Sequence, residues 1–236
     1  MQKSGLASSI ILAISITLAG YFVGQTYIAG KKLDRTVVVK GLAEREVQAD
    51  IATWPLELTV SGNELGQLQK TLEHQTKILQ DFFAGLEFTE EELTVGAPTI
   101  QDNRALLYGG QNAYNQDRYI AKVDFNLRTT KLDKMSEAMY KVPSIVGQGL
   151  VIGSKNTWQP VQYIYTKLND IKPEMIEEAT KNAREAAEKF ARDSGSNVGK
   201  IKSANQGYFS ITDLDQNSGV MKKVRIVSTL EFYIED

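Results

Sequence analysis

Few residues in this chain could carry out chemistry. His74 is the only histidine, so a hydrolytic triad or a multi-histidine metal site would depend on a single imidazole. It lies between the polar residues Glu73 and Gln75 and off the spacing of the nearby leucines, which is typical of an exposed helix position. The chain has no cysteine, which excludes disulfides, thiolate metal ligands and thiol nucleophiles.

A calcium site is the next possibility, because Asp213, Asp215 and Asn217 follow the D-x-D-x-N opening of an EF-hand loop. Ser218 stands where that loop needs its sharp-turn glycine, and Val224 stands where it needs a bidentate glutamate. The segment is therefore better interpreted as a polar connection into the last strand.

The three consecutive glutamates, Glu90, Glu91 and Glu92, form an acidic cluster. No second catalytic group accompanies them, so we interpret them as a solvated turn. The sequence also lacks a G-x-S-x-G elbow, a G-x-G-x-x-G fingerprint and a Gly-Lys-Thr phosphate loop. We therefore predict no catalytic residue, no metal ligand and no cofactor.

The segment from Gln101 to Arg118 is polar apart from a few leucines and tyrosines. A long loop of this kind is often functional, and exposed tyrosines suit recognition. A hairpin tip is one interpretation, and a contact with a partner or subunit is another. A ligand-binding module would be expected to have a concave site near this loop.

Strands with one polar face are the first elements that must position these residues. Apolar and polar residues alternate from Tyr119 to Thr129, and the same period occurs at 56–60 and 224–232. Pro55 and Pro160 indicate edges or bulges. One-sided strands are typical of an antiparallel or mixed sheet. Further strands are expected at 36–40, 93–100, 161–166 and 201–206.

Helical spacing of leucines predicts a long helix at 64–86 and a shorter one at 130–140, limited by Pro143. A second long helix is predicted to have Pro173 in its first turn and to stop at Gly195. Small residues along it favour close packing on a sheet, with a subunit contact as the alternative. This apolar seam is Ile176, Ala179, Ala183, Ala186 or Ala187, and Phe190. The fold class is α+β, with two long helices and one shorter one.

The N-terminal segment carries no charged side chain from Ser4 to Gly30. As a helix it would be about 40 Å long, which is enough to span a membrane. A signal peptide has small residues at the last and third-last positions before its cleavage site, but cleavage after Ala29 would place the bulky Tyr27 at the third-last position. An uncleaved transmembrane anchor is therefore favoured over a cleaved signal peptide or a buried soluble helix. Residues 1–30 are thus the predicted anchor or signal segment, and residues 31–236 the predicted α+β domain.

The charge balance excludes one class of partner. The chain has 27 basic and 29 acidic residues and a formal net charge of −2, without a basic stripe. Nucleic acid is therefore not an expected partner. Positive residues flank both ends of the apolar segment, so charge alone does not fix its orientation in a membrane.

Leu168–Gly207 has the sequence LNDIKPEMIEEATKNAREAAEKFARDSGSNVGKIKSANQG. This stretch resembles the signature region of the SIMPL-domain family of bacterial envelope proteins. Val37–Val60, VVVKGLAEREVQADIATWPLELTV, resembles its opening hairpin, and Lys222–Ile234, KKVRIVSTLEFYI, its final strand. Many members carry proline before the aspartate of the hairpin, whereas here Ala49 precedes Asp50, which leaves the local turn geometry open.

The resemblance implies a SIMPL-like α+β fold and a body on the periplasmic side of a single-pass inner-membrane anchor. It implies a homo-oligomer, ring-like or channel-like in some relatives, with a possible envelope protein partner and a role in envelope or oxidative stress. It implies no enzymatic activity. One alternative is a periplasmic module that binds a small ligand or glycan, and another is a hydrolase or metal-dependent enzyme that uses His74 or the pair Asp213 and Asp215.

Overall fold

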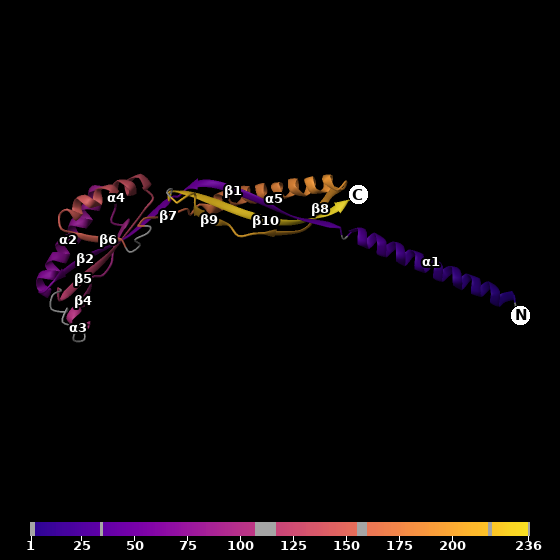
Figure 1. Ribbon diagram of the computed structural model, residues 1–236, viewed down its shortest axis with the longest axis horizontal. Coiled ribbons are helices and arrows are strands. Elements are labelled where there is room, and N and C mark those ends of the chain that lie inside the picture. The colour runs from indigo at the N-terminus through magenta and orange to yellow at the C-terminus, as the bar shows by residue number, and fades with distance from the viewer. Residues whose placement is uncertain (1–2, 34, 107–116, 155–159, 217–218, 236) are drawn as a thin grey trace. The chain divides into compact units, whose positions relative to one another are not determined.

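The computed structural model describes residues 3–33, 35–106, 117–154, 160–216 and 219–235. Their helices and strands form an α+β structure (Figure 1). The chain divides into two compact units. Unit 1 contains residues 1–45, 169–211 and 224–236, and unit 2 contains residues 46–168 and 212–223.

Unit 1 is built on a four-stranded sheet. Its strands are β1 (Thr36–Gln48), β10 (Met221–Glu235), β8 (Asn197–Gln206) and β9 (Ser210–Asp213). β10 lies in the centre, with β1 on one side and β8 antiparallel to it on the other, and β9 also pairs with β10. The predicted strands at 36–40, 201–206 and 224–232 are therefore confirmed, although each is longer than expected.

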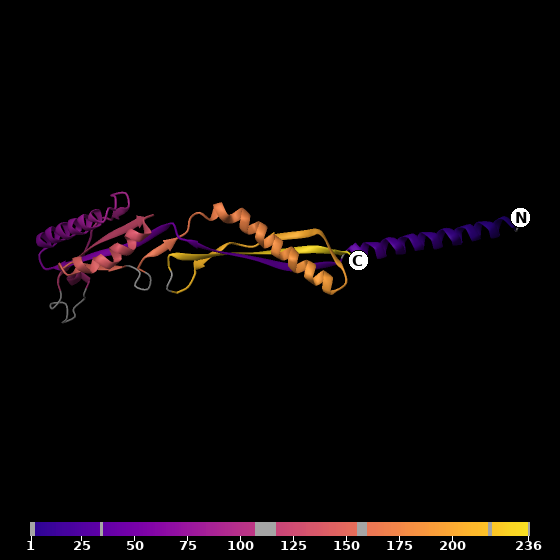
Figure 2. The ribbon, with the colours of Figure 1, turned by 90° about the horizontal axis from the view of Figure 1, so that it is seen from above.

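Helix α5 (Leu168–Asp193) packs on one face of this sheet and crosses the strands obliquely (Figure 2). Its buried residues recur at intervals of four, which is a row inclined to the helix axis. They are Met175, Ala179, Ala183, Ala187 and Ala191. The predicted small-residue seam is confirmed at its alanines, but Phe190 is 63% exposed, so its place in the seam was wrong.

Gly41 on β1 lets the helix approach this closely. A Cβ atom added there would lie 1.8 Å from the Ala179 carbonyl oxygen and 2.8 Å from the Ala183 Cβ atom. On the next residue of β1, the Leu42 carbonyl oxygen accepts a hydrogen bond from Nδ2 of Asn182, 2.8 Å away. The helix thus rests on the strand through a glycine and a row of alanines.

Unit 2 contains a six-stranded antiparallel sheet with β2 (Ile51–Gly62) and β5 (Tyr119–Thr129) at its centre. Burial alternates strictly along both strands, which confirms the predicted one-sided pattern. The shorter strands are β3 (Leu93–Val95), β4 (Thr99–Asp102), β6 (Val151–Ser154) and β7 (Gln162–Ile164). Pro55 is in the central strand β2. On one side of β2, residues 51–53 pair with β7 and residues 56–59 pair with β6, so Pro55 lies in the gap between these two pairings.

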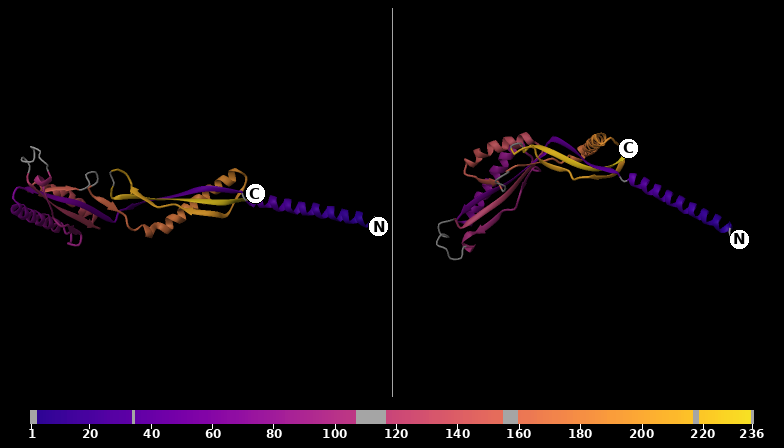
Figure 3. Two further views of the ribbon diagram at one scale, coloured as in Figure 1. Left: turned by 90° about the horizontal axis from the view of Figure 1, so that it is seen from below. Right: turned by 45° about the vertical axis from the view of Figure 1, so that its right-hand side comes forward.

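Two helices cover the buried face of this sheet (Figure 3). They are α2 (Leu65–Gly85), as predicted, and α4 (Leu132–Val146), and the four-residue helix α3 (Asn103–Leu106) follows β4. The largest buried side chains beneath them are aromatic or branched, including Phe83, Phe125, Leu56 and Leu79. They form one core cluster with the even-numbered residues of β2.

Helix α1 (Lys3–Leu33) occupies the predicted N-terminal segment. Among the described residues, however, no helix combines the length and apolar character that a membrane span requires. The helix is therefore observed, whereas a transmembrane role for it is not supported by this finding.

Two prolines mark helix positions that the sequence placed wrongly. Helix α4 continues past Pro143, whose carbonyl oxygen accepts a hydrogen bond from the Gly147 N–H at 3.2 Å. Helix α5 begins at Leu168, so Pro173 lies inside it and not in its first turn. A proline removes the bond that its own nitrogen would donate and its ring crowds the carbonyl group four residues earlier, but packing on the sheet retains the helix around it. Gly195, with φ of 71°, does end α5 as predicted.

The corner between β1 and β2 has Ala49 and not proline before Asp50. The Ala49 N–H donates a hydrogen bond to the Val220 carbonyl oxygen at 2.8 Å, which a proline could not do. Asp50 accepts two hydrogen bonds from Thr166, one from its N–H and one from its hydroxyl. Burial would raise the pKa of Asp50, but these bonds outweigh it and hold that pKa below its usual value.

Candidate functional site

A turn at residues 89–92 in unit 2 lies between two concave sites, one of about 490 Å³ and one of about 320 Å³. Glu90 lines the larger site, and Glu91 and Glu92 line the smaller one. The acidic segment that the sequence singled out therefore contributes to both.

The end of α2 positions this turn. Glu87 adopts φ of 65°, a left-handed conformation that usually requires glycine. The Glu87 N–H donates to the Ala84 carbonyl oxygen, and the Phe88 N–H donates to that of Phe83. Together these bonds form a Schellman motif, and the Phe88 ring packs edge-on against Phe83 at 5.9 Å between centroids. The chain is thereby turned back beneath its own helix.

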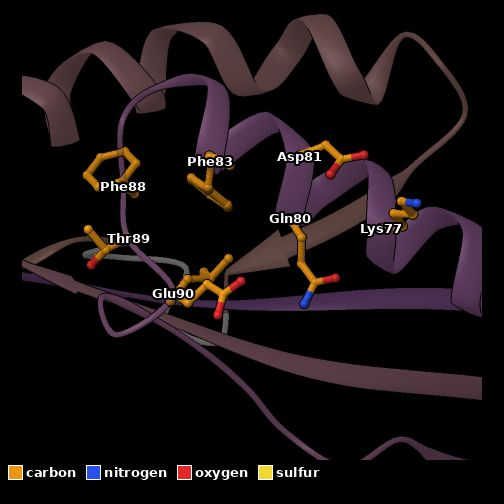
Figure 4. A pocket seen from close by; sticks show the side chains of 9 residues that line it. Lys77, Gln80, Asp81, Phe83, Phe88, Thr89 and Glu90 are labelled. Atoms are coloured by element: carbon orange, nitrogen blue, oxygen red, sulfur yellow. The ribbon is translucent and has the colours of Figure 1, made fainter.

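The larger site lies between the last turns of α2 and the returning chain (Figure 4). Its apolar lining comes from Phe83, Ala84, Phe88 and Leu93. Its polar lining comes from Lys77, Gln80, Asp81, Thr89 and Glu90. In Figure 4 the side chains of Gln80 and Glu90 extend into the same space below the helix. We call this site the α2 cleft.

The side chains of Lys77, Gln80, Asp81 and Glu90 are exposed and, among the described residues, none has a hydrogen bond or ion pair. The first three of them were not predicted from the sequence as site residues. A signal was present, because residues 77, 80 and 81 fall on one side of the predicted helix near its end. What the sequence could not show was the chain returning opposite them.

The smaller site contrasts with the α2 cleft because one of its two carboxylates, that of Glu92, is engaged by several donors. Glu92 accepts hydrogen bonds from the Thr129 hydroxyl at 2.5 Å, the Thr89 N–H at 2.9 Å and Lys131 Nζ at 2.9 Å. Burial alone would raise the pKa of Glu92, but these donors lower it to about 2. Lys131 also donates to the Glu87 carbonyl oxygen at 2.8 Å, so the network fixes the left-handed turn.

The prediction of a solvated acidic turn is therefore right for Glu90 and Glu91, which are exposed, and wrong for Glu92. Only 16% of the Glu92 side chain is exposed. Its partner Thr129 is the last residue of β5 and Lys131 follows that strand, so their approach depends on the antiparallel pairing of β3 with β5.

The base of the polar segment 101–118 is held by a separate network, while its glycines and tyrosines lie outside the described residues. Asp102 accepts two hydrogen bonds from the Arg118 guanidinium, at 3.0 and 3.1 Å, which lower the pKa of Asp102. Asp117 accepts from the Ser61 hydroxyl at 2.5 Å and from Asn63 at 3.0 Å. None of these residues lines the α2 cleft, so the cleft is not where the sequence predicted a concave site.

The other candidates from the sequence lie apart from the cleft. His74 is exposed on α2, as predicted for a surface histidine. Asp213 forms an ion pair with Lys222, and the Leu214 N–H donates to the Met221 carbonyl oxygen, so this segment connects β9 to β10. Asn217 lies outside the described residues. Among the residues that are described, no group of three or more acidic or histidine side chains is arranged to hold a metal ion.

Comparison with protein families gives a match. The model of the SIMPL family, described as a protein of unknown function (DUF541), matches residues 37–226. No curated protein matches the chain.

Proposed function

Because the chain belongs to the SIMPL family, whose function is unknown, we propose that it is a non-enzymatic envelope protein that acts by assembling with copies of itself. In this proposal α1 anchors it in the bacterial inner membrane, with the rest of the chain in the periplasm. An envelope protein partner and a part in envelope or oxidative stress belong to the same proposal.

The anchoring role is supported by the composition and exposure of α1. No charge interrupts the sequence from Ser4 to Gly30. The large apolar side chains described on it are exposed, among them Leu12, Ile16 and Phe22. A reporter fused after Asp236 should be active only in the periplasm, and the protein should stay with the membrane in alkaline carbonate. Release by carbonate at a reduced mass would indicate a cleaved signal peptide instead.

Assembly is supported chiefly by the outer edge of β1. Within the described residues β1 pairs only with β10, although it is 13 residues long. The Arg35 carbonyl oxygen accepts from the Ile234 N–H, so odd-numbered residues of β1 direct their backbone toward β10. Even-numbered residues direct theirs outward, and at Val38 and Lys40 this edge is a template for a strand of another copy, whereas the Leu42 carbonyl oxygen is already bonded to Asn182.

A proline at this edge tests assembly sharply. Lys40→Pro should leave the β10 pairing intact, since the N–H that it removes points outward, but it should block an added strand. Lys40→Thr is the matched control, because threonine keeps the N–H and suits a strand. We expect the full chain in detergent to be oligomeric by light scattering, the Thr variant likewise, and the Pro variant monomeric with unchanged circular dichroism. A monomeric parent protein would contradict the proposal.

A second function, binding of a small envelope ligand or glycan, is supported by the α2 cleft. Its volume of about 490 Å³ falls within the range of small-molecule sites. Four of its polar side chains lack partners among the described residues, namely Lys77, Gln80, Asp81 and Glu90. Hydrolase chemistry has less support, since His74 is exposed on a helix and Asp213 is engaged by Lys222.

A further inference from the structure

We infer that the α2 cleft binds a small organic ammonium compound with an apolar body. This inference rests on the second function above, ligand binding, and specifies the chemical class of the ligand. It is independent of assembly, which involves β1 in the other unit.

The contrast between the two sites beside the 89–92 turn separates a structural carboxylate from one available to a ligand. Glu92 is satisfied by three donors and stabilises the turn. Glu90, two residues earlier, contributes its carboxylate to the α2 cleft without any hydrogen bond or ion pair to a described residue. A carboxylate beside an apolar surface gains most from a charged donor, because charge-assisted hydrogen bonds are the strongest.

The net charge of the cleft lining indicates that the ligand carries a positive charge. Asp81 and Glu90 bring two negative charges and Lys77 one positive charge, so the lining has an excess of one negative charge. Gln80 extends into the same space as Glu90, and its amide oxygen could accept a second hydrogen bond from an ammonium group (Figure 4).

The apolar lining limits the rest of the ligand. Ala84 is exposed and Leu93 half-buried, whereas Phe83 and Phe88 are 0% and 6% exposed, so the apolar body of a ligand would bury surface chiefly against Ala84 and Leu93. Lys131 lies 6.0 Å from the Phe88 ring centroid, but its charge is paired with Glu92 and does not oppose a cation in the cleft. An ammonium group attached to an aromatic or branched body fits both parts of the lining.

The test uses phenethylammonium as the probe and 3-phenylpropionate as its anionic counterpart. The readout is the methyl resonance of Ala84 in the full chain in detergent, which reports on the cleft and not on uptake by micelles. We expect a saturable shift with phenethylammonium, with a Kd of about 1 mM, and none with phenylpropionate.

Charge variants complete the test. Glu90→Gln should weaken binding about tenfold, whereas Glu91→Gln, an adjacent exposed residue on the smaller site, should not change it. Lys77→Gln should tighten binding about twofold, because it removes a repelling charge. Equal effects of Glu90→Gln and Glu91→Gln would overturn the inference, and so would absence of a saturable shift.

Saturable binding of phenylpropionate with equal affinity would overturn the ammonium class but leave ligand binding itself standing. If neither probe shifts the Ala84 methyl resonance, ligand binding at the α2 cleft fails with it. Neither result affects assembly, which light scattering measures separately.

Discussion

Both units pack a long helix on a sheet, but the contact is made by small side chains in unit 1 and by large ones in unit 2. In unit 1 the contact between α5 and the sheet is made by Gly41 and a row of alanines. In unit 2 the contact between α2 and the sheet is made by Phe83 and leucines. At Gly41 the interface of unit 1 has no room for an added atom. The interface of unit 2 would lose packing contacts if atoms of its large side chains were removed. The units should therefore respond in opposite ways to a change of side-chain volume.

The largest effect is expected from removing a ring in unit 2. Phe83 is fully buried and contacts Trp54, Phe82 and Phe88 edge-on. Phe83→Ala should lower the free energy of unfolding of unit 2 by about 3–5 kcal/mol. Tryptophan fluorescence in urea measures it, because Trp54 lies in unit 2 and its ring contacts Phe83. Phe190→Ala, at an exposed position of α5, should change stability by no more than about 0.5 kcal/mol. Similar losses in both variants would break the comparison.

Adding one methyl group in unit 1 should have the next largest effect. Gly41→Ala places its Cβ atom against the Ala179 carbonyl oxygen, so α5 must move away from the sheet. We expect unit 1 to lose about 3 kcal/mol of stability, measured as faster amide hydrogen exchange along α5. Gly153→Ala on β6 is the control, because nothing lies within 4 Å of the added atom. Unchanged exchange in Gly41→Ala would show that the close approach is not needed.

The turn after α2 sharpens the comparison through its dependence on pH. The pKa of Glu92 is about 2 in the folded chain, against an ordinary value of 4.5. Its contribution is therefore fully present above pH 4.5 and is lost as the pH falls toward 2. Glu92→Gln should lower the free energy of unfolding of unit 2 by about 2 kcal/mol at pH 7. The same variant should lose less stability than the parent protein as the pH falls from 4.5 to 2. Glu91→Gln should leave urea unfolding curves at both pH values unchanged.

The smallest effect concerns how the two helices end. Both ends require a left-handed residue, which is Gly195 after α5 and Glu87 after α2. Glu87→Gly should raise the stability of unit 2 by about 0.5–1 kcal/mol, because glycine relieves the strain of a side chain in that conformation. The lost ion pair with Lys134 is exposed and offsets little of this gain. Gly195→Ala should lower the stability of unit 1 by a similar amount, and a gain in that variant would contradict the explanation.

Periodicity predicted the elements well where burial is one-sided. β5 was predicted at its exact bounds, and α2 within one residue at each end, because their apolar residues follow the period of the element. The predicted strand at 93–100 is instead two strands, β3 and β4, separated around Gly96, and β6 and β9 were not predicted. Short strands carry too few residues for a period to be recognised.

The candidate site was less accessible from the sequence. The acidic turn was visible as three glutamates, but nothing in their order distinguishes Glu92, which accepts three donors, from Glu90, which has no described partner. Their difference depends on Thr129 and Lys131, which reach only one of them. The residues of α2 that complete the cleft were assigned simply to the polar side of a helix.

By itself the sequence determined the α+β class, the family and the long one-sided elements, because burial of one face imposes a period that local order records. It also determined that residues 4–30 carry no charged side chain, though not what the helix that contains them does. Only the tertiary structure decided which alanines contact Gly41, which glutamate is satisfied and where a cleft opens. Those outcomes depend on contacts between residues that are far apart in the sequence. A local sequence pattern contains no information on which distant residues come into contact.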